Sequence, residues 1–301
     1  DHYLKAPTWY QEHHKTDAGA RIAYFSAEFG IHESVLNYAG NKNPEAIACT
    51  HEEISVAMAN GYAKIDGKPV LVCAHATVGL QHAVMALYDA WCDRVPVYLV
   101  LGNTNDASQR NGDVYWVHSA QDPASIVRDF SKWDDQPVSL QHFAESAVRA
   151  YKVMMTPPMG PVAITLDTEL QEEAIPPGTN LRIPKLSQSQ PPAGDMGAVN
   201  DAAKMLVAAE NPVLIAGRMA RTPEGLKHLV ELAELLQCAV LDQHRRLNFP
   251  SRHPLNQSLR AGQGGKPLMI PPALAPDLVV GLESNDFFTS MRLLKQRNMN
   301  F

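Results

Sequence analysis

Two adjacent carboxylates, Glu52 and Glu53, interrupt an apolar part of the chain and are the residues best placed for chemistry. They follow the apolar residues 45–50 and His51, and they precede a stretch with apolar residues at helical spacing that contains Gly-Tyr-Ala at 61–63. This pattern predicts a strand, a turn and a helix, with a carboxylate at the carboxyl end of the strand. Open α/β sheets bind their ligands at that edge. Burial in an apolar pocket disfavours the charged form of a carboxylate, which suits it to share a proton with a ligand.

A second group of polar residues follows the next apolar run. Residues 70–74 come after Gly-Lys-Pro and are followed directly by His75. A glycine turn with Gly79 and His82 comes next. The carboxyl ends of parallel strands meet at one edge of a sheet, so we expect these residues near Glu52.

These motifs together closely resemble the pyrimidine-binding domain of thiamine-diphosphate (ThDP) enzymes of the acetolactate synthase and benzoylformate decarboxylase type. In that family a Glu lies nine residues before the Gly of Gly-Tyr-Ala, and counting back from Gly61 selects Glu52. The resemblance runs from about residue 33 to about residue 284. It implies that Glu52 hydrogen-bonds the aminopyrimidine of the cofactor, shares a proton with it and so activates the cofactor. Glu53 fits better a carboxylate that the helix N-terminus favours.

The same resemblance implies further site residues. His75 stands where some decarboxylase relatives carry a histidine that acts on the substrate, and the alternative is a half-buried imidazole bonded to the backbone. Gly79 permits the start of a helix to approach the pyrimidine closely. Leu80 and His82 are expected beside the cofactor, and relatives often have Asn at the position of His82.

The loop after the fourth expected strand carries His118 and Gln121, which are weaker candidates for contacts with the substrate. A surface position is the alternative for His118. We expect no metal ligands in this chain, because the Gly-Asp-Gly motif that anchors Mg²⁺ and the diphosphate in the family does not occur. The family's complete enzymes use ThDP with Mg²⁺. The chain ends at Phe301, about where the diphosphate-binding domain would begin, so the chain alone is expected to be inactive.

Strand-like runs alternate with helix-like runs, which is typical of parallel sheets flanked by helices. We expect strands at 21–25, 45–50, 70–74, 96–101, 161–166, 212–216, 238–242 and 277–282. We expect helices at 31–38, 79–93, 139–155 and 196–209, and a further helix to residue 237 with Thr222 as its N-cap and Pro223 at its first position. Trp133 is expected to pack, and Asp134 and Asp135 to form a solvated turn.

The fold class is therefore predicted as α/β, with two doubly wound parallel-sheet domains and no diphosphate-binding domain. We expect a pyrimidine-binding domain at 35–172, a proline-rich linker at 173–194, and a central domain at 195–301 that is incomplete at its C-terminus. Residues 215–220 of the central domain do not form a GxGxxG loop, so FAD is not expected.

Residues 1–34 depart from this pattern. Residues 3–11 and 21–34 resemble the N-terminus of an α-glucan phosphorylase, but the glycine-rich loop and pyridoxal-phosphate lysine region of that family are missing. We therefore predict a chimera, either real or introduced by sequence assembly. Residues 22–25 are apolar enough to supply the first strand of the sheet.

Composition narrows the remaining choices. The 301 residues are 45% hydrophobic and carry a net charge of −6, which suits two globular domains and does not favour nucleic acid or membrane partners. The four cysteines show no CxxC spacing, so free thiols in a reducing cytoplasm are expected.

The functional hypothesis is the N-terminal portion of a homodimeric or tetrameric ThDP enzyme that acts on a 2-keto acid, by decarboxylation, carboligation or both. The alternative is a non-catalytic binding or assembly module that retains the pyrimidine-domain fold. A fragment of a glucan phosphorylase is a remote third possibility.

Overall fold

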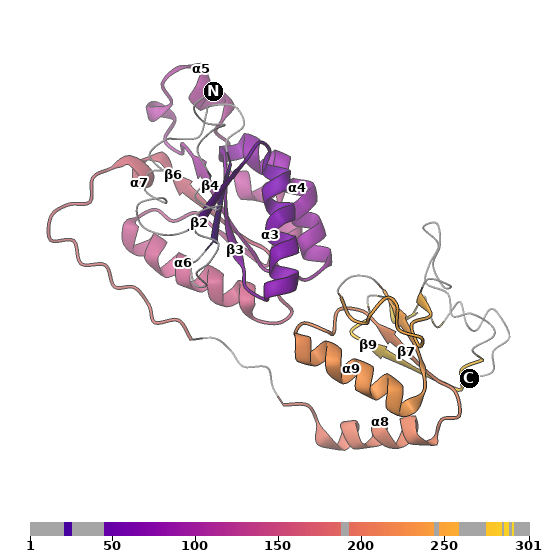
Figure 1. Cartoon of the computed structure of the whole chain (residues 1–301). Helices are drawn as coiled ribbons and strands as arrows, with labels where there is room; N and C mark the ends of the chain where they lie inside the picture. Colours follow the sequence, from indigo (N-terminus) through magenta and orange to yellow (C-terminus); the bar gives the residue numbers. More distant parts are fainter. Residues whose placement is uncertain are drawn as a thin grey trace. The chain divides into compact units, whose positions relative to one another are not determined.

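The computed structural model describes residues 21–25, 45–187, 193–243, 247–258, 275–284, 286–288 and 291. The chain divides into two compact units, Asp1–Pro191 and Pro192–Phe301, and each contains one parallel sheet (Figure 1). The predicted fold class of two parallel-sheet α/β domains is confirmed. Within the described residues, no helix is both long and apolar enough to cross a membrane.

The sheet of the first unit has six strands, and all of its strand pairs are parallel. The strands follow the order β2-β1-β3-β4-β6-β5, so β1 lies between β2 and β3. Their carboxyl ends therefore share one edge of the sheet. The strands are β1 (Arg21–Phe25), β2 (Glu45–Cys49), β3 (Val70–Ala74), β4 (Val97–Asn103), β5 (Trp133–Asp135) and β6 (Val162–Asp167).

Helices cover both faces of this sheet. Helices α3 (Glu52–Asp66) and α4 (Ala76–Cys92) pack side by side on one face, and α6 (Leu140–Met155) covers the other near β6 (Figure 1). An N-cap residue with an extended backbone comes directly before each of these helices. Helix α3 ends at Gly67, whose left-handed φ of 72° favours glycine. The shorter helices α5 (Gly112–Val117) and α7 (Thr168–Glu172) and three 3₁₀ turns lie in the connections.

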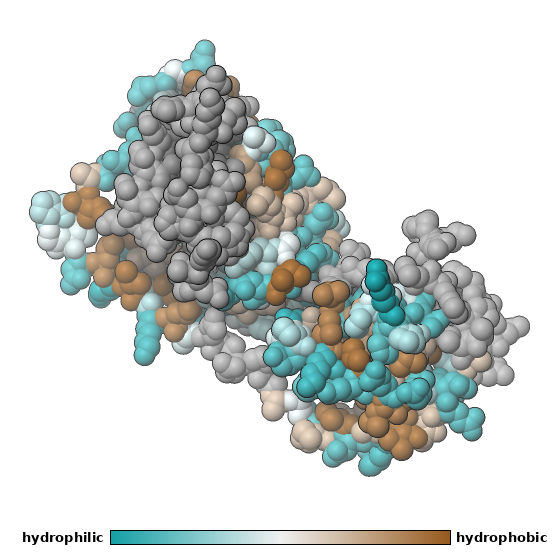
Figure 2. Space-filling model, in the orientation of Figure 1, coloured by the Kyte–Doolittle hydropathy of each residue, from teal (hydrophilic) through white to brown (hydrophobic). Residues whose placement is uncertain are grey.

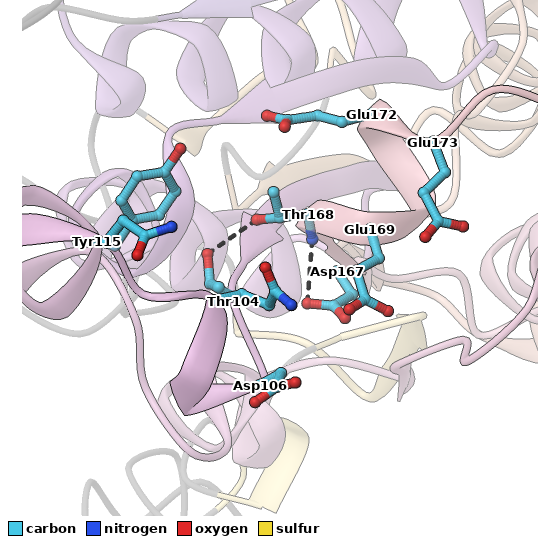
Figure 3. Close-up of a pocket in the computed structure, with 10 residues that line it drawn as sticks. Thr104, Asp106, Tyr115, Asp167, Thr168, Glu169, Glu172 and Glu173 are labelled. Carbon is cyan, nitrogen blue, oxygen red and sulfur yellow. Dashed lines mark hydrogen bonds between the residues drawn. The ribbon is translucent and has the colours of Figure 1, made fainter.

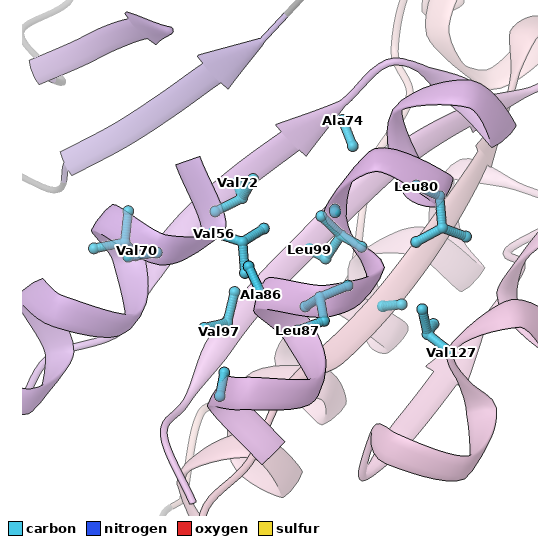
Figure 4. Packing of buried hydrophobic residues seen from close by; sticks show 14 of the residues in the cluster. Val56, Val70, Val72, Ala74, Leu80, Ala86, Leu87, Val97, Leu99 and Val127 are labelled. Carbon is cyan, nitrogen blue, oxygen red and sulfur yellow. The ribbon is translucent and has the colours of Figure 1, made fainter. Parts of the chain in front are cut away.

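The core of the first unit lies between the sheet and the pair α3 and α4 (Figure 4). Val56 and Leu80 come from the helices and pack with Val72 and Leu99 from the strands, and all four are fully buried. Burial alternates along β4, so every second residue from Val97 to Asn103 faces the interior. This alternation brings a polar side chain, that of Asn103, to the buried side of the sheet edge.

Within its described residues, the second unit has a three-stranded parallel sheet in the order β8-β7-β9 and two helices of more than ten residues. Thr222 caps α9 as predicted, because its Oγ1 accepts from Gly225 N at 3.0 Å, and Pro223 begins the helix. The elements are α8 (Met196–Ala208), β7 (Pro212–Ala216), α9 (Pro223–Leu236), β8 (Ala239–Asp242) and β9 (Leu278–Leu282). In the last part of the first unit, residues 173–187 form no helix or strand.

One local expectation was wrong in part. Trp133 packs against the apolar cluster of α6 and β6, as expected. Asp134 and Asp135 do not form a solvated turn, because Trp133–Asp135 form the edge strand β5, which pairs with β6. Partners from the flanking segments hold the carboxylates of β5, because Asp135 accepts from Ser146 Oγ and Asp134 accepts from Arg128 at 2.8 Å. The strand is too short to show an alternating pattern of its own. The helix expected at 31–38 lies outside the described residues.

Leu99 offers a test of this packing, because it is fully buried in the central part of the sheet. Leu99→Ala should lower the free energy of unfolding of the first unit by about 2–5 kcal/mol, since it removes buried methyl groups and leaves a cavity. Ile65→Ala on the exposed surface of α3 should change the free energy by less than about 0.5 kcal/mol. Urea denaturation measures both, and equal losses would contradict this core.

Candidate active site

Glu52 is the first residue of α3 and lies three residues after Cys49, the last residue of β2. Its side chain is buried, with 2% of the residue exposed, whereas Glu53 is exposed. Successive residues of a helix point about 100° apart, so only one of two adjacent carboxylates can face the sheet. The inward-facing residue is Glu52, which lies nine residues before Gly61.

The Glu52 carboxylate lies between a histidine and a glycine. Oε2 is 3.2 Å from Nδ1 of His82, and Oε1 occupies space beside Gly79. A Cβ at Gly79 would lie 2.8 Å from Glu52 Oε1 and 3.2 Å from the backbone carbon of Ala74. A side chain at position 79 would therefore press on the Glu52 carboxylate and on the backbone at the end of β3, whereas the φ of Gly79 is not in the left-handed region and would itself allow other residues.

His51 completes this first cluster. Its Nδ1 accepts from Glu53 N at 3.2 Å, which makes it the N-cap of α3. Its ring also stacks on His82, with 4.7 Å between the ring centroids and 14° between the planes. Sequence reasoning assigned His51 no role, although its place before two carboxylates at a helix start indicated a cap.

A second cluster joins His75 and His118. His75 follows β3 at the start of α4, and its ring meets that of His118 edge to face with centroids 4.8 Å apart. His118 Nδ1 lies 2.6 Å from the carbonyl oxygen of Val114, so Nδ1 carries the hydrogen. His118 is half-buried against another imidazole, and the alternative of a bare surface histidine was wrong.

Asn103 fixes the loop that carries His118. Its Nδ2 donates to Ala120 O at 2.9 Å, and its Oδ1 accepts from Ala120 N at 3.1 Å. Two hydrogen bonds to one residue hold the loop at the end of β4, two residues beyond His118. Asn103 was missed by sequence reasoning, and the polar end of the alternating pattern in β4 is the signal that could have found it.

The remaining candidates are placed differently. Leu80 is fully buried in the core of the first unit, on the side of the cluster that holds Leu99 and Val127 (Figure 4). Gln121 is exposed next to the clamped Ala120. Among the residues that the structure describes, no group of three or more His, Cys, Asp and Glu side chains converges to hold a metal ion.

The strand that leads to His75 also carries a thiol. Burial raises the pKa of Cys73 to about 11, so the neutral thiol dominates near pH 7. The thiolate is the nucleophilic form of cysteine. This arrangement therefore does not support a Cys–His nucleophilic site, although the two residues lie close in the sequence.

A pocket of about 310 Å³ opens beside the carboxyl ends of β4 and β6 (Figure 3). The hydroxyls of Thr104 and Thr168 are hydrogen-bonded to each other at 2.8 Å in its wall. Its lining has five carboxylates, which would repel a diphosphate or a 2-keto acid. These are Asp106, Asp167, Glu169, Glu172 and Glu173. The pocket does not include Glu52 or His75. The two histidine clusters therefore indicate the chemistry of the site better than this acidic pocket does.

Parallel α/β sheets with a buried carboxylate at the carboxyl edge define a class of ligand-binding enzyme folds. Residues 18–126 match the family model for the N-terminal, cofactor-binding domain of thiamine pyrophosphate enzymes. Residues 199–297 match the family model for the central domain of the same enzymes. The chain belongs to the thiamine pyrophosphate, or ThDP, enzymes.

Curated and solved relatives agree with this family. The chain is 27% identical over 209 residues to a benzoylformate decarboxylase of Pseudomonas aeruginosa, covering 67% of this chain and 38% of the relative. It is 21% identical over 220 residues to an acetolactate synthase of Bacillus subtilis, covering 73% and 37%. The crystal structure of benzoylformate decarboxylase from Polynucleobacter necessarius matches with a TM-score of 0.68 at 22% identity, covering 88% and 48%, which shows the fold. The chain thus spans about two fifths of the length of these curated relatives.

The family match also bears on the N-terminal segment. The match begins at residue 18, and Arg21–Phe25 forms β1 inside the sheet, as the sequence predicted for the first strand. The rest of residues 1–34 lies outside the described residues. The chimera with a phosphorylase-like front and the boundary at residue 34 stay predictions.

Gly79 provides a test of the carboxylate's position. Gly79→Ala should lower the free energy of unfolding by about 1–3 kcal/mol, because its Cβ collides with Glu52 and with the backbone of β3. Gly61→Ala in α3 is the matched control, because a Cβ there meets nothing within 4 Å. The control should be neutral or stabilising by about 0.5–1 kcal/mol.

A double-mutant cycle separates the two contacts of Gly79. In a Glu52→Ala background the cost of Gly79→Ala should fall, because the closest colliding atom is then absent. Chemical denaturation of the four proteins gives the coupling. Full additivity would show that Glu52 does not lie against Gly79.

Proposed function

We propose that these residues form the cofactor-activating part of a ThDP-dependent enzyme that acts on a 2-keto acid, by decarboxylation, carboligation or both. The observation that carries the proposal is the buried carboxylate of Glu52 at the carboxyl edge of the sheet, with its Oε1 in the space that Gly79 leaves by having no side chain. The names of the relatives, a decarboxylase of benzoylformate and a synthase of acetolactate, support the reaction class.

The residues present fit the aminopyrimidine half of the cofactor. We propose that Glu52 holds a proton at a ring nitrogen, and that the missing side chain at Gly79 lets the Glu52 carboxylate lie against the start of α4, where the ring would bind. When bound, ThDP supplies the electron sink for cleavage or formation of a bond next to a carbonyl group. The described residues offer no comparable grouping for Mg²⁺, so we assign neither the metal nor the diphosphate to any of them.

Glu52 is proposed to act as the acid–base group that exchanges a proton with the aminopyrimidine ring. Its burial excludes water, so a proton held by the carboxylate would pass to the ring instead of being lost to solvent. His82 lies beside the same carboxylate, and we propose that it lines the cofactor site.

His75 and His118 are proposed to face the substrate. Both lie at the carboxyl edge of the sheet, His75 after β3 and His118 on the loop that Asn103 clamps to β4. The hydrogen on His118 Nδ1 is used by Val114 O, so a neutral His118 offers a lone pair on Nε2. Paired imidazoles near neutral pH can move protons to and from a carboxylate or a carbonyl oxygen of the substrate.

The central domain and the cysteines complete the proposal. The expected boundaries, with a pyrimidine domain at 35–172, a linker at 173–194 and a central domain at 195–301, remain our proposed division of the chain.

The four cysteines are free thiols, namely Cys49, Cys73, Cys92 and Cys238. Free thiols persist in reducing compartments, and we propose a cytoplasmic location on that ground.

Glu52→Gln is the sharpest test of the proposed chemistry. With a diphosphate-binding domain on the same chain or supplied by a partner, it should slow proton exchange at C2 of bound ThDP by roughly two or more orders of magnitude. The amide keeps the shape of the side chain but cannot share the proton. Hydrogen–deuterium exchange followed by NMR measures the rate.

Glu53→Gln is the matched control, because Glu53 is the exposed neighbour on the same helix turn. It should leave the exchange rate nearly unchanged. If Glu53→Gln is the crippling change and Glu52→Gln is mild, the register counted from Gly61 is wrong and the proposed pocket falls with it.

We further propose that the chain assembles as a homodimer or tetramer. Met85, Tyr88 and Trp91 form an exposed apolar stripe along α4, and the loop after β4 exposes a second group at 114–117. Figure 2 shows apolar side chains at the surface of the molecule on the face displayed. Such exposed apolar stripes mark surfaces that pair, most often by two-fold symmetry.

Met85→Glu tests this assembly. Light scattering at high concentration should find a dimer or larger species for the wild type. Met85→Glu should raise the dissociation constant by about tenfold or more, because it buries an unpaired charge at the interface. Val207→Glu on α8 serves as control, since Val207 is also exposed but lies outside the stripe. A monomeric wild type would contradict the assembly.

A further inference from the structure

The Glu52 carboxylate is held on both sides by groups of this chain. Oε1 lies against Gly79, and Oε2 lies 3.2 Å from His82 Nδ1. With 3% of its side chain exposed, Glu52 has little access to water, whereas His82 keeps 40% of its side chain exposed. His82 therefore joins a buried carboxylate to the surface of the protein.

The position of His82 is in turn fixed by His51. The two rings are stacked and nearly parallel, and His51 is anchored because its Nδ1 accepts from the backbone N of Glu53. An acceptor nitrogen has no hydrogen, so His51 is a neutral imidazole with its hydrogen on Nε2. The stack thus places a rigid, neutral ring against His82 and restricts the rotation that would turn Nδ1 away from Glu52.

The hydrogen in this contact must come from one of the two partners. When the Glu52 carboxylate is ionised it only accepts hydrogen bonds, so His82 must then donate from Nδ1. A neutral His82 then has its hydrogen on Nδ1 and presents the lone pair of Nε2 at its exposed side. Free imidazole side chains in water favour the opposite tautomer, with the hydrogen on Nε2, so the contact leaves a measurable signature.

We infer that His82 is a positioning residue, which orients the Glu52 carboxylate by donating from Nδ1 to Oε2 and is itself held in place by the stacked ring of His51. The inference rests on the proposed function, because the oriented group is the one assigned to the cofactor. His82 fixes Oε2, Gly79 gives room to Oε1, and the plane of the carboxylate is set before any ligand arrives. Preorganisation of this kind lowers the cost of aligning an acid–base group during the reaction.

The tautomer of His82 gives a readout that needs no cofactor. Long-range ¹H–¹⁵N correlation spectra of the ¹⁵N-labelled chain report which ring nitrogen of each neutral histidine carries the hydrogen. His82 should show the hydrogen on Nδ1, with its signals assigned from their loss in His82→Asn. Glu52→Met keeps the bulk of the side chain but removes the acceptor, and it should return His82 to the Nε2 tautomer.

Two further variants separate the stack from the helix cap. His51→Asn keeps a good N-cap but removes the ring, so it should reduce the Nδ1 preference of His82 while α3 remains intact. His228→Leu on the exposed face of α9 is a control that should leave the His82 signals unchanged. A wild-type His82 with its hydrogen on Nε2, or one that Glu52→Met does not change, would overturn the inference.

Rescue in the ThDP-loaded protein tests the consequence for the reaction. His82→Leu should slow proton exchange at C2 on the order of tenfold, the scale of one lost hydrogen bond, and His82→Asn should recover most of the rate because its amide can donate. Equal slowing by both variants would show that the ring matters only for packing and would overturn the inference. If Glu52→Gln fails to slow exchange while the tautomer result holds, the proposed function falls and the contact between His82 and Glu52 stands.

Discussion

The structure of the first unit is organised around the burial of one carboxylate at the edge of a parallel sheet. Burying such a group costs several kcal/mol unless hydrogen bonds compensate it. Here the compensation comes from His82, and the space comes from Gly79. These two residues belong to α4. The site therefore requires the start of α4, the end of β3 and the start of α3 to lie next to one another.

The sheet order explains why these pieces meet. Strand β1 lies between β2 and β3, and the connection from β2 to β3 through α3 therefore crosses over β1. Helices α3 and α4 pack against each other over this part of the sheet, with Val56 and Leu80 in the core between them. Their first turns are brought together at the carboxyl edge, where Glu52 and His75 stand. Packing of aliphatic side chains thus fixes a polar site at the end of the core.

Much of this arrangement was predictable from local patterns. The strands at β1, β3 and β7 and the capped start of α9 follow from apolar runs and from the Thr222-Pro223 pair. The choice of Glu52 over Glu53 for the cofactor site came from the family resemblance, in which the Glu lies nine residues before the Gly of Gly-Tyr-Ala, and the structure buries Glu52. These signals lie within one element or between neighbouring elements.

The features that sequence reasoning missed depend on contacts between distant residues. Strand β5 exists because β6 pairs with it and because Arg128 and Ser146 hold its carboxylates. The clamp from Asn103 to Ala120 and the pair of His75 with His118 join segments from different loops. A single sequence shows the residue types at these positions but not which of them meet.

The central claim is that Glu52 is the carboxylate that meets the aminopyrimidine of ThDP, and a crystal structure of the ThDP-bound protein tests it most directly. The account predicts a Glu52 carboxylate oxygen within hydrogen-bonding distance, about 2.5–3.2 Å, of a nitrogen of the pyrimidine ring, with Glu53 in solvent. It predicts that the other oxygen of Glu52 remains beside His82. A bound pyrimidine that contacts Glu53, or no carboxylate of α3, would contradict the account.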